Sequence, residues 1–301
     1  MISIVIPTHN RKELLKRAVD SVLNQTYKDI EVIVVSDGST DGTSEIMKDY
    51  RLSDKRVLFF EYHPPRSGNY ARNFGIKQSK GEYVAFLDDD DEWLPSKLEK
   101  QIEIMKKDAK VGLVYTGVKI IYENDGVKYS FIGKAQGKVT KDILLDNCIG
   151  TTSTVLIKKS VLDKVGGFDN NLAALQDYDL WIRICDCCNI GVIQEELVNY
   201  YNYRGCKQVS AVTQKYVDAF NYINEKYSAL YSKLNKEEFS KKKSNECMLI
   251  ANKAMRNGDS ILSRKYIIMA LRYSFTVKSV CYYLLSFLSY RTILIMRSLN
   301  K

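Results

Sequence analysis

The chain has little of what marks a disordered, secreted or membrane-spanning protein. Its 301 residues include only 4 Pro and 16 Gly, and 45% are apolar, so a large hydrophobic core can form. No basic stretch with a long apolar segment precedes the first strand-like run, so we expect no signal peptide. No apolar run approaches the roughly 20 residues of a membrane-spanning helix, and the run at 280–290 ends at Arg291.

Histidine and cysteine are too few and too dispersed to predict a metal site. The two histidines, His9 and His63, are far from the cluster of Cys185, Cys187 and Cys188, whose spacing is wrong for a zinc knuckle. We expect these cysteines on a half-buried helix. The seven cysteines form an odd, scattered set, which is typical of reduced thiols in a cytoplasmic protein.

Nucleotide-binding glycine motifs are also absent. The sequence contains no Walker A motif and no Gly-x-Gly-x-x-Gly. ATPase and dinucleotide-cofactor functions therefore lose their main support.

Basic charge is concentrated in the last third. Residues 205–301 contain 17 Lys and Arg against 6 Asp and Glu, whereas residues 1–204 are nearly neutral. The later pattern is helical, with an amphipathic segment at 260–274, so we place a domain boundary near 205–210.

Three interpretations of this basic region stay open. Its helices could lie on an anionic membrane surface, aided by the Ser-Lys-Lys-Lys-Ser segment at 240–244. They could equally form a homodimer interface or a packed cap. We expect no nucleic-acid partner.

The first ninety residues alternate between apolar and amphipathic segments. Strands are predicted at 2–7, 30–36, 56–60 and 82–87, and helices at 11–26, 43–52 and 69–79. The strands are continuously apolar, which indicates burial on both faces, and the alternation predicts a mainly parallel α/β sheet.

Three details complete this prediction. Residues 111–116 are expected to extend the sheet, and residues 118–132 read as a hairpin that turns at Asn124-Asp125-Gly126. Asn10, with Glu13 three residues later, is predicted to start the first helix.

Polar loops follow three of the predicted strands. They are "PTHNR" at 7–11, "SDGSTDGT" at 36–43 and "DDDDEW" at 88–93. Because ligands bind at the carboxyl ends of parallel strands, we expect the three loops to meet at one edge of the sheet.

The four consecutive aspartates at 88–91 require compensation. Adjacent carboxylates raise one another's pKa unless a cation balances them. Mg²⁺ or Mn²⁺ commonly links one or two carboxylates to substrate phosphates, and we favour this interpretation for Asp88 and Asp90. Asp91 and Glu92 could instead cap a helix that starts near Pro95.

Six segments, in this order, resemble family 2 glycosyltransferases: "SIVIPTHNR", "VIVVSDGSTDGT", "ARNFGI", "GEYVAFLDDDDEW", "VGGFD" and "LQDYDLWIRI". The resemblance covers roughly residues 1–204. It implies the GT-A fold, a Rossmann-like and mainly parallel sheet, and inverting transfer of a sugar from a UDP- or dTDP-sugar. The acceptor would be a hydroxyl of a glycan or lipid-linked molecule, with Mn²⁺ or Mg²⁺ as cofactor, in bacterial surface polysaccharide synthesis.

The resemblance also implies the donor-binding residues. In the first two loops, the nucleotide pocket would be lined by Pro7, Thr8, Asn10, Asp37 and Ser39. Arg72 would lie near the nucleotide or diphosphate, since a guanidinium suits phosphate oxygens; the alternative is an ion pair on a helix surface.

Asp88, Asp89 and Asp90 occupy the position of the family's Asp-x-Asp motif. Asp90 would be the direct metal ligand, while Asp88 would contact the ribose. Asp89 is assigned to the donor site with them.

The catalytic base of the family lies in the segment matched by "LQDYDLW" at 175–181. The family often has Glu-Asp there, whereas this chain has Gln176-Asp177. Asp177 keeps the carboxylate that would take the proton of the acceptor hydroxyl, and Gln176 cannot ionise. The alternative is that Asp177 only caps a helix running through Trp181.

Motifs that the sequence lacks count against two other classes of enzyme. No Gln-x-x-Arg-Trp motif of processive synthases is present, which predicts single-sugar transfer. A sugar-phosphate nucleotidyltransferase usually carries a Gly-rich basic N-terminal loop that is missing here. A non-catalytic nucleotide-sugar-binding partner subunit is the third alternative. We expect a cytoplasmic enzyme, at the inner face of the cell membrane if the basic region binds there.

Overall fold

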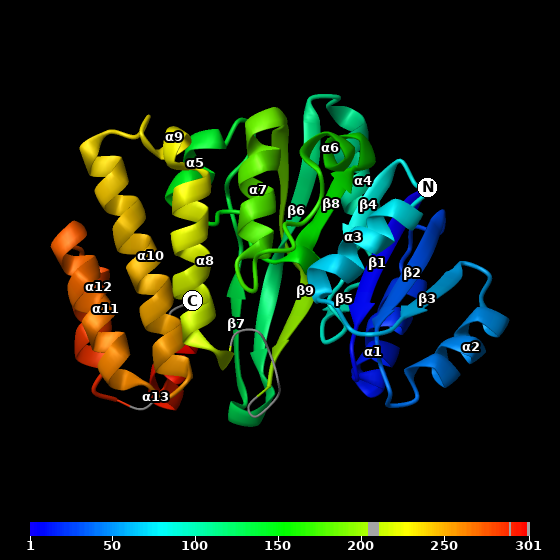
Figure 1. Cartoon of the computed structure of the whole chain (residues 1–301), viewed down its shortest axis with the longest axis horizontal. Coiled ribbons are helices and arrows are strands. Elements are labelled where there is room, and N and C mark those ends of the chain that lie inside the picture. The colour runs from blue at the N-terminus through cyan, green and yellow to red at the C-terminus, as the bar shows by residue number, and fades with distance from the viewer. Residues whose placement is uncertain (204–210, 289, 300–301) are drawn as a thin grey trace.

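The computed structural model describes residues 1–203, 211–288 and 290–299 (Figure 1). The strands are β1 Ile2–Thr8, β2 Ile30–Asp37, β3 Val57–Tyr62, β4 Tyr83–Phe86, β5 Glu92–Trp93, β6 Val111–Tyr122, β7 Val127–Phe131, β8 Val155–Lys158 and β9 Asn189–Asn202. The α-helices are α1 Lys12–Leu23, α2 Thr43–Ser53, α3 Gly68–Gln78, α4 Lys97–Lys107, α5 Thr140–Leu145, α6 Lys159–Val165, α7 Gln176–Cys187, α8 Thr213–Lys226, α9 Ser228–Tyr231, α10 Lys236–Arg256, α11 Ser260–Tyr273, α12 Val277–Leu285 and α13 Tyr290–Leu299. Two short 3₁₀ helices are η1 Glu123–Asp125 and η2 Thr152–Thr154.

The strands form a single sheet in the order β3-β2-β1-β4-β8-β6-β9-β5, with β7 paired to β6. The first four strands are parallel, as predicted. Beyond them β8 runs antiparallel to both β4 and β6, and β9 runs parallel to β6. The predicted extension at 111–116 and the hairpin at 118–132 are confirmed as β6 and β7.

The central strands are buried on both faces, as their apolar sequences predicted. Every residue of β1 and β2 is buried. On one face, Ile4 and Ile6 pack in a cluster with Leu15 of α1. Helix α3 covers the other face, where Gly75 lies against Val5 of β1.

The C-terminal helices α8 and α10 continue this core. Phe220, Ile223 and Ile250 belong to the same apolar cluster as Trp181 of α7. Helices α8, α9 and α10, called the cap below, therefore pack on the core, and the membrane and dimer interpretations of the region stay predictions. The predicted domain boundary near 205–210 lies outside the described residues, and no described helix has the length and apolarity needed to cross a bilayer.

Buried polar contacts fasten the cap to α7. Asp179 is fully buried, and its carboxylate binds Arg183 at 2.7 Å, Lys226 at 2.7 Å and Tyr227 at 2.8 Å. The first partner lies on α7 itself and the other two belong to the cap. Asp179, a helix residue for which the sequence predicted no role, is thus one polar link between the two parts. Asp169 forms another with Tyr222 and Lys226.

The predicted cap of one helix was wrong, and an alternative cap of a second helix is excluded. Helix α1 is preceded by Arg11 rather than capped by Asn10, which has a φ of 53°. Asp91 and Glu92 do not cap α4, since its N-cap is Ser96. Both carboxylates instead accept hydrogen bonds from Tyr201 of the neighbouring strand β9: Asp91 from its backbone N–H and Glu92 from its hydroxyl.

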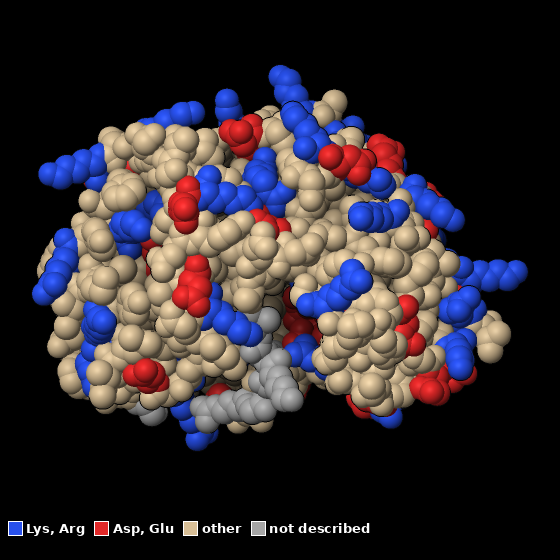
Figure 2. Space-filling view, in the orientation of Figure 1, with Lys and Arg blue, Asp and Glu red and all other residues tan. Residues whose placement is uncertain are grey.

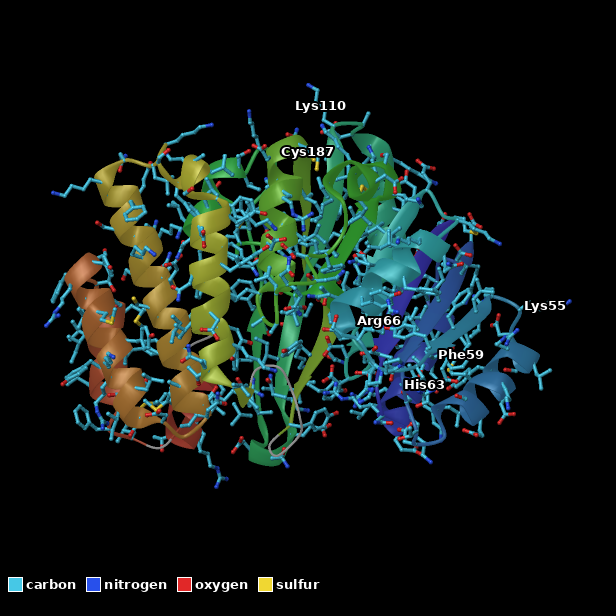
Figure 3. The ribbon with its side chains drawn as sticks, viewed as in Figure 1. Lys55, Phe59, His63, Arg66, Lys110 and Cys187 are labelled. Carbon is cyan, nitrogen blue, oxygen red and sulfur yellow. The ribbon has the colours of Figure 1, made fainter. Side chains whose placement is uncertain are left out.

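The basic segment at 240–244 is only partly exposed: Lys241 is exposed and Lys243 is half-buried. Lys242 lies in the interior, 1% exposed, and forms an ion pair with Glu246. Figure 2 shows Lys and Arg side chains spread over both halves of the visible face rather than in one stripe. The cysteine prediction is confirmed, because Cys185 is buried near the end of α7 and Cys187 is half-buried (Figure 3).

The close packing of α3 on β1 predicts a large effect of adding side-chain atoms at Gly75. A Cβ there would lie 2.3 Å from Val5 Cγ1, so Gly75→Val overpacks the core. We expect a loss of about 2 kcal/mol in the free energy of unfolding, measured by urea denaturation. Lys77→Val, at an exposed position of the same helix, should cost only a few tenths. Equal losses for the two variants would contradict this packing account.

Candidate functional site

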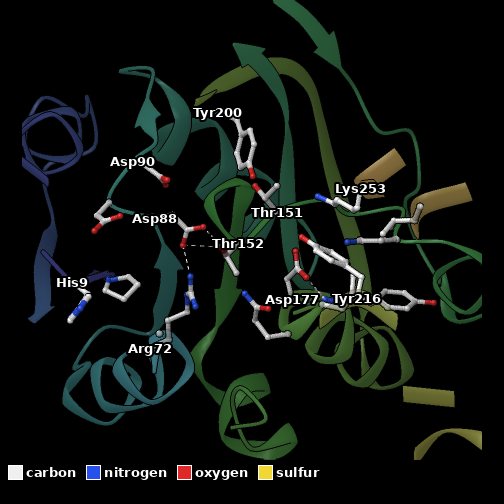
Figure 4. Close-up of a pocket in the computed structure, with 18 of the residues that line it drawn as sticks. His9, Arg72, Asp88, Asp90, Thr151, Thr152, Asp177, Tyr200, Tyr216 and Lys253 are labelled. Carbon is white, nitrogen blue, oxygen red and sulfur yellow. Dashed lines mark hydrogen bonds and ion pairs between the residues drawn. The ribbon is translucent and has the colours of Figure 1, made fainter. Parts of the chain in front are cut away.

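A cavity of about 770 Å³ lies at the carboxyl ends of β1, β2 and β4 (Figure 4). The three predicted loops meet there. The cavity brings together all the predicted site residues except Ser39: Pro7, Thr8, Asn10, Asp37, Arg72, Asp88, Asp89, Asp90 and Asp177. Its opposite wall is formed by α7, β9, α8 and α10.

Asn10 and Ser39 tie the first two loops together. The backbone N–H of Asn10 donates to Ser39 Oγ at 3.1 Å, and Thr40 N–H donates to Asn10 Oδ1 at 2.7 Å. These bonds stabilise the left-handed backbone of Asn10, which is unusual for a residue other than glycine. Ser39 is buried and lies outside the cavity lining. Ser39 therefore holds Asn10 in position and does not itself face the cavity.

Asp37 ends β2 within the cavity wall. Its Oδ1 accepts a hydrogen bond from the backbone N–H of Arg66 at 2.6 Å, which fixes the carboxylate at the strand end. His9 Nδ1 lies 2.5 Å from the Asp37 carbonyl oxygen and also lines the cavity. The sequence placed His9 in a loop but did not assign it to the site.

Asp88 and Asp89 each have a basic and a hydroxyl partner. Arg72 Nη2 binds Asp88 Oδ1 at 2.6 Å, and Thr152 Oγ1 lies 3.2 Å from the same carboxylate. Asp89 accepts from Thr8 Oγ1 at 2.8 Å and from Arg11 Nη1 at 3.0 Å. Burial raises the pKa of Asp89 to about 6, although Arg11 favours the charged form. Protein side chains therefore balance much of this negative charge.

The other two aspartates point to different environments. Asp90 lines the cavity and accepts from Arg11 Nη1 at 3.1 Å. Asp91 is fully buried beneath it and accepts from Ser153 Oγ at 2.6 Å. Burial raises the pKa of Asp91 well above its usual value, and Asp90 and Asp88 add to the shift. The acidic run thus divides into three cavity residues and one interior residue.

Arg72 is part of the cavity wall rather than of a helix surface. Its side chain is only 9% exposed and reaches from α3 to Asp88 (Figure 4). Its Nε is buried and has no hydrogen-bond acceptor within the described ranges. The guanidinium therefore presents a donor that an oxygen of a bound ligand could satisfy.

Asp177 faces this acidic loop from the opposite wall. It is the second residue of α7, and Leu175 before the helix has a φ of 57°, a strained conformation for leucine. The N-cap is Leu175, so the capping interpretation of Asp177 was wrong. Burial raises the pKa of Asp177 to about 6, and Asp88 contributes further. A carboxylate with a pKa near neutrality suits proton transfer.

The sequence did not identify several other side chains of the cavity, among them Arg11, Tyr200, Tyr216 and Lys253. Arg11 balances two aspartates, and its only signal was its place in the first loop. Tyr200, Tyr216 and Lys253 come from β9, α8 and α10. No motif marks these three, because they reach the cavity only through the packing of distant elements.

The carboxylates fit a divalent ion that is shared with a ligand. Asp88 and Asp90 offer oxygen atoms, which Mg²⁺ and Mn²⁺ prefer, at one edge of the cavity. Within the described part of the chain, no group of three or more His, Cys, Asp or Glu is arranged to hold an ion. These residues would therefore hold an ion together with substrate phosphates, rather than enclose it alone.

Comparisons with known sequences identify the family of the chain. Residues 3–166 match the profile of "Glycosyl transferase family 2". An uncharacterized glycosyltransferase of Rickettsia typhi is 35% identical over 248 residues, which cover 79% of this chain and 74% of that protein. The Escherichia coli protein WfgD, a UDP-Glc:alpha-D-GlcNAc-diphosphoundecaprenol beta-1,3-glucosyltransferase, is 34% identical over 64% of this chain and 73% of its own length.

Solved structures show the same architecture. Residues 1–349 of Staphylococcus aureus TarS, in complex with UDP-GlcNAc, superpose with a TM-score of 0.61 at 17% identity, covering 91% of this chain and 88% of that one. A Pyrobaculum calidifontis mannosyltransferase with GDP-Man and Mn²⁺ gives 0.56 at 15% identity, covering 99% and 87%. The chain therefore belongs to glycosyl transferase family 2, is a glycosyltransferase, and has the GT-A fold that its sequence motifs predicted.

Proposed function

We propose that the protein is a metal-dependent, inverting transferase of single sugars. It moves a sugar from a UDP- or dTDP-sugar to a hydroxyl of a glycan or lipid-linked acceptor, in bacterial surface polysaccharide synthesis. The observation that carries this proposal is the cavity in which Asp177 faces the Asp88–Asp90 loop and Arg72.

The donor would occupy the side of the cavity formed by β1, β2 and β4. Asp37 would accept hydrogen bonds from the nucleotide, Pro7, Thr8 and Asn10 would line its pocket, and Asp88 would bind the ribose. Arg72 Nε, which lacks an internal acceptor among the described residues, would donate to a diphosphate oxygen. Asp90 would hold Mn²⁺ or Mg²⁺ beside the diphosphate, and the bound ion would stabilise negative charge on that group.

The acceptor would approach from the side of Asp177. With its pKa near 6, Asp177 is mostly ionised at pH 7 and can take the proton of an acceptor hydroxyl as that oxygen attacks the sugar carbon. Figure 4 shows Asp177 across the cavity from Asp88 and Asp90. Attack from the side opposite to the departing diphosphate inverts the configuration at that carbon.

The relatives support the substrate classes. The name of the Escherichia coli relative gives a UDP-sugar donor and a diphosphate-linked lipid acceptor for that protein. The Pyrobaculum calidifontis structure contains a nucleotide sugar together with Mn²⁺. Neither observation favours a nucleotidyltransferase or a non-catalytic subunit.

The exposed apolar face of α11, α12 and α13 supports a membrane location, and we propose that this surface binds an anionic bilayer. Phe275 is 76% exposed and Leu284 is 64% exposed. Lys278 and Arg291 are exposed on the same helices, and no Asp or Glu follows Asp259 in the sequence. Apolar side chains flanked by cations are typical of interfacial helices on anionic lipid.

The substitution Asp177→Asn tests whether Asp177 is the catalytic base. We expect sugar transfer to fall by about 100-fold or more, because Asn cannot take the proton. In the parent enzyme kcat/KM should decline as the pH falls below about 6, the pKa of Asp177. Asp186→Asn, at an exposed position of the same helix, is the control and should leave both quantities unchanged. Retained transfer by Asp177→Asn would contradict the assignment of the base.

The same variant, Asp177→Asn, is expected to gain stability although it loses activity. The raised pKa means that the folded state binds the Asp177 proton more tightly than the unfolded state does. Its contribution to the free energy of unfolding is therefore present at low pH and lost as the pH rises from about 4 to 6. Asp177→Asn should be more stable at pH 7 by about 1–3 kcal/mol, with a flatter pH dependence in urea denaturation. A less stable variant would disagree with this origin of the pKa shift.

Metal removal tests the role of Asp90. We expect chelation with EDTA to abolish UDP release from a panel of UDP-sugars, and added Mn²⁺ or Mg²⁺ to restore it. Asp90→Asn should require a higher Mn²⁺ concentration for half-maximal activity, while Asp163→Asn, an exposed aspartate of α6, should not. Full activity in EDTA would exclude a metal-dependent reaction.

Vesicle flotation of the full chain tests the membrane surface. We expect binding to phosphatidylglycerol-containing vesicles that weakens as salt is added, because cations contribute to it. The double variant Phe275→Ser/Leu284→Ser should lose most of this binding. Leu52→Ser is the matched control, since Leu52 is 86% exposed on α2 at the far end of the molecule (Figure 1). Equal flotation with neutral phosphatidylcholine vesicles would refute the proposal.

A further inference from the structure

Lys253 brings a positive charge to the side of the cavity that Asp177 lines. It lies on α10, outside the segment matched by the family profile. Its ammonium stands over the ring of Tyr216, with Nζ 4.7 Å from the ring centroid. Within residues 1–203, 211–288 and 290–299, the ammonium forms no hydrogen bond or ion pair, and the Asp177 carboxylate favours its charged form only from a longer distance.

The other basic side chains around the described part of the cavity are already paired. Arg11 binds Asp89 and Asp90. Arg72 binds Asp88. Lys253 therefore differs from them, since it faces the cavity without a carboxylate in direct contact, although the charge of Asp177 acts on it from the same side.

An ammonium in this position is costly unless something balances it. Burial lowers the pKa of Lys253 to about 8, Arg256 lowers it further and Asp177 partly opposes the shift. Burying an unpaired charge is unfavourable, so a bound anion would stabilise the charged form. A neutral hydroxyl could accept a hydrogen bond from Lys253 but would not balance its charge.

A second polar group on this side also lacks a partner. Thr151 lines the cavity, and its hydroxyl is buried and has no hydrogen-bond partner among the described residues. In Figure 4 the ammonium of Lys253 points toward Thr151. Aromatic side chains of Tyr216 and Phe220 line the same wall and offer faces on which a sugar ring can pack.

From these contacts, and resting on the proposed transfer reaction, we propose that Lys253 and Thr151 bind an anionic group of the acceptor, a phosphate or a carboxylate. The anion would lie near the hydroxyl that Asp177 deprotonates. The acceptor would then be a sugar that carries a phosphate or diphosphate, or a glycan that contains an acidic sugar. A neutral glycan would leave Lys253 with no direct anionic partner and would be a poorer acceptor.

Lysine labelling of the full-length protein tests this site without a known acceptor. The protein is held with saturating UDP and Mg²⁺, so that the donor side is filled, and the acylation rate of each lysine is measured by mass spectrometry across pH. Three probes are compared: glucose 1-phosphate, glucuronate and methyl glucoside. We expect an anionic probe to slow the labelling of Lys253 by several fold and to raise its pKa above 8. Methyl glucoside should do neither.

Controls within the same experiment make the outcomes distinct. Lys265, exposed on α11, should label equally with every probe. Protection by glucose 1-phosphate alone would assign a phosphate, and protection by glucuronate alone would assign a carboxylate. Equal protection by methyl glucoside, or no protection by any probe, would overturn the proposal. Failure of UDP to bind would instead count against the proposed donor site, and the labelling result would still stand.

Substitutions provide an independent readout. Lys253→Met should weaken binding of the protective probe by about tenfold or more, whereas Lys253→Arg should retain most of it. Lys265→Met should not change it. Unchanged probe affinity in Lys253→Met would contradict the proposal, and a circular dichroism spectrum of that variant would show whether it is folded.

Discussion

The pairing of Arg11 and Arg72 with the acidic loop is the interaction on which the site depends. Three consecutive aspartates, Asp88 to Asp90, point into one cavity, and carboxylates in a partly desolvated place would otherwise take up protons. One guanidinium comes from the end of β1 and the other from α3, so the order of the parallel strands places a cation on each side of the loop. The fold thus makes a cluster of negative charge stable enough to receive a ligand.

The opposite wall of the cavity depends on the C-terminal helices. Asp179 binds Lys226 and Tyr227 of the cap, and the same helix carries Asp177 two residues earlier. Because Asp179 is fully buried, the position of α7 and that of α8 are coupled through a charged contact that is costly to break. This contact also fixes the distance between Asp177 and the residues that the cap supplies. The region outside the family profile is therefore part of the site and not an appendage.

Local sequence patterns predicted the features that depend on hydrophobic periodicity and on the order of the strands. The apolar runs gave the strands, and the parallel topology brought the three loops together, as the segments at 7–11, 36–43 and 88–93 predicted. The patterns did not predict the position of side chains whose hydrogen-bond partner is decided by the folded structure. Asn10 accepts a bond from Thr40 instead of capping a helix, Asp91 turns inward to Ser153, and Lys242 is buried against Glu246. No spacing in a single sequence encodes such pairings, which exist only after the chain has folded.

A crystal structure with UDP and Mn²⁺ tests the central claim most directly, because Mn²⁺ can be located by anomalous scattering. The account predicts an ion bound by Asp90 and the UDP diphosphate, with the nucleotide between Asp37 and Arg72 and the side of Asp177 left open. An ion elsewhere, or a nucleotide that does not touch the Asp88–Asp90 loop, would contradict it.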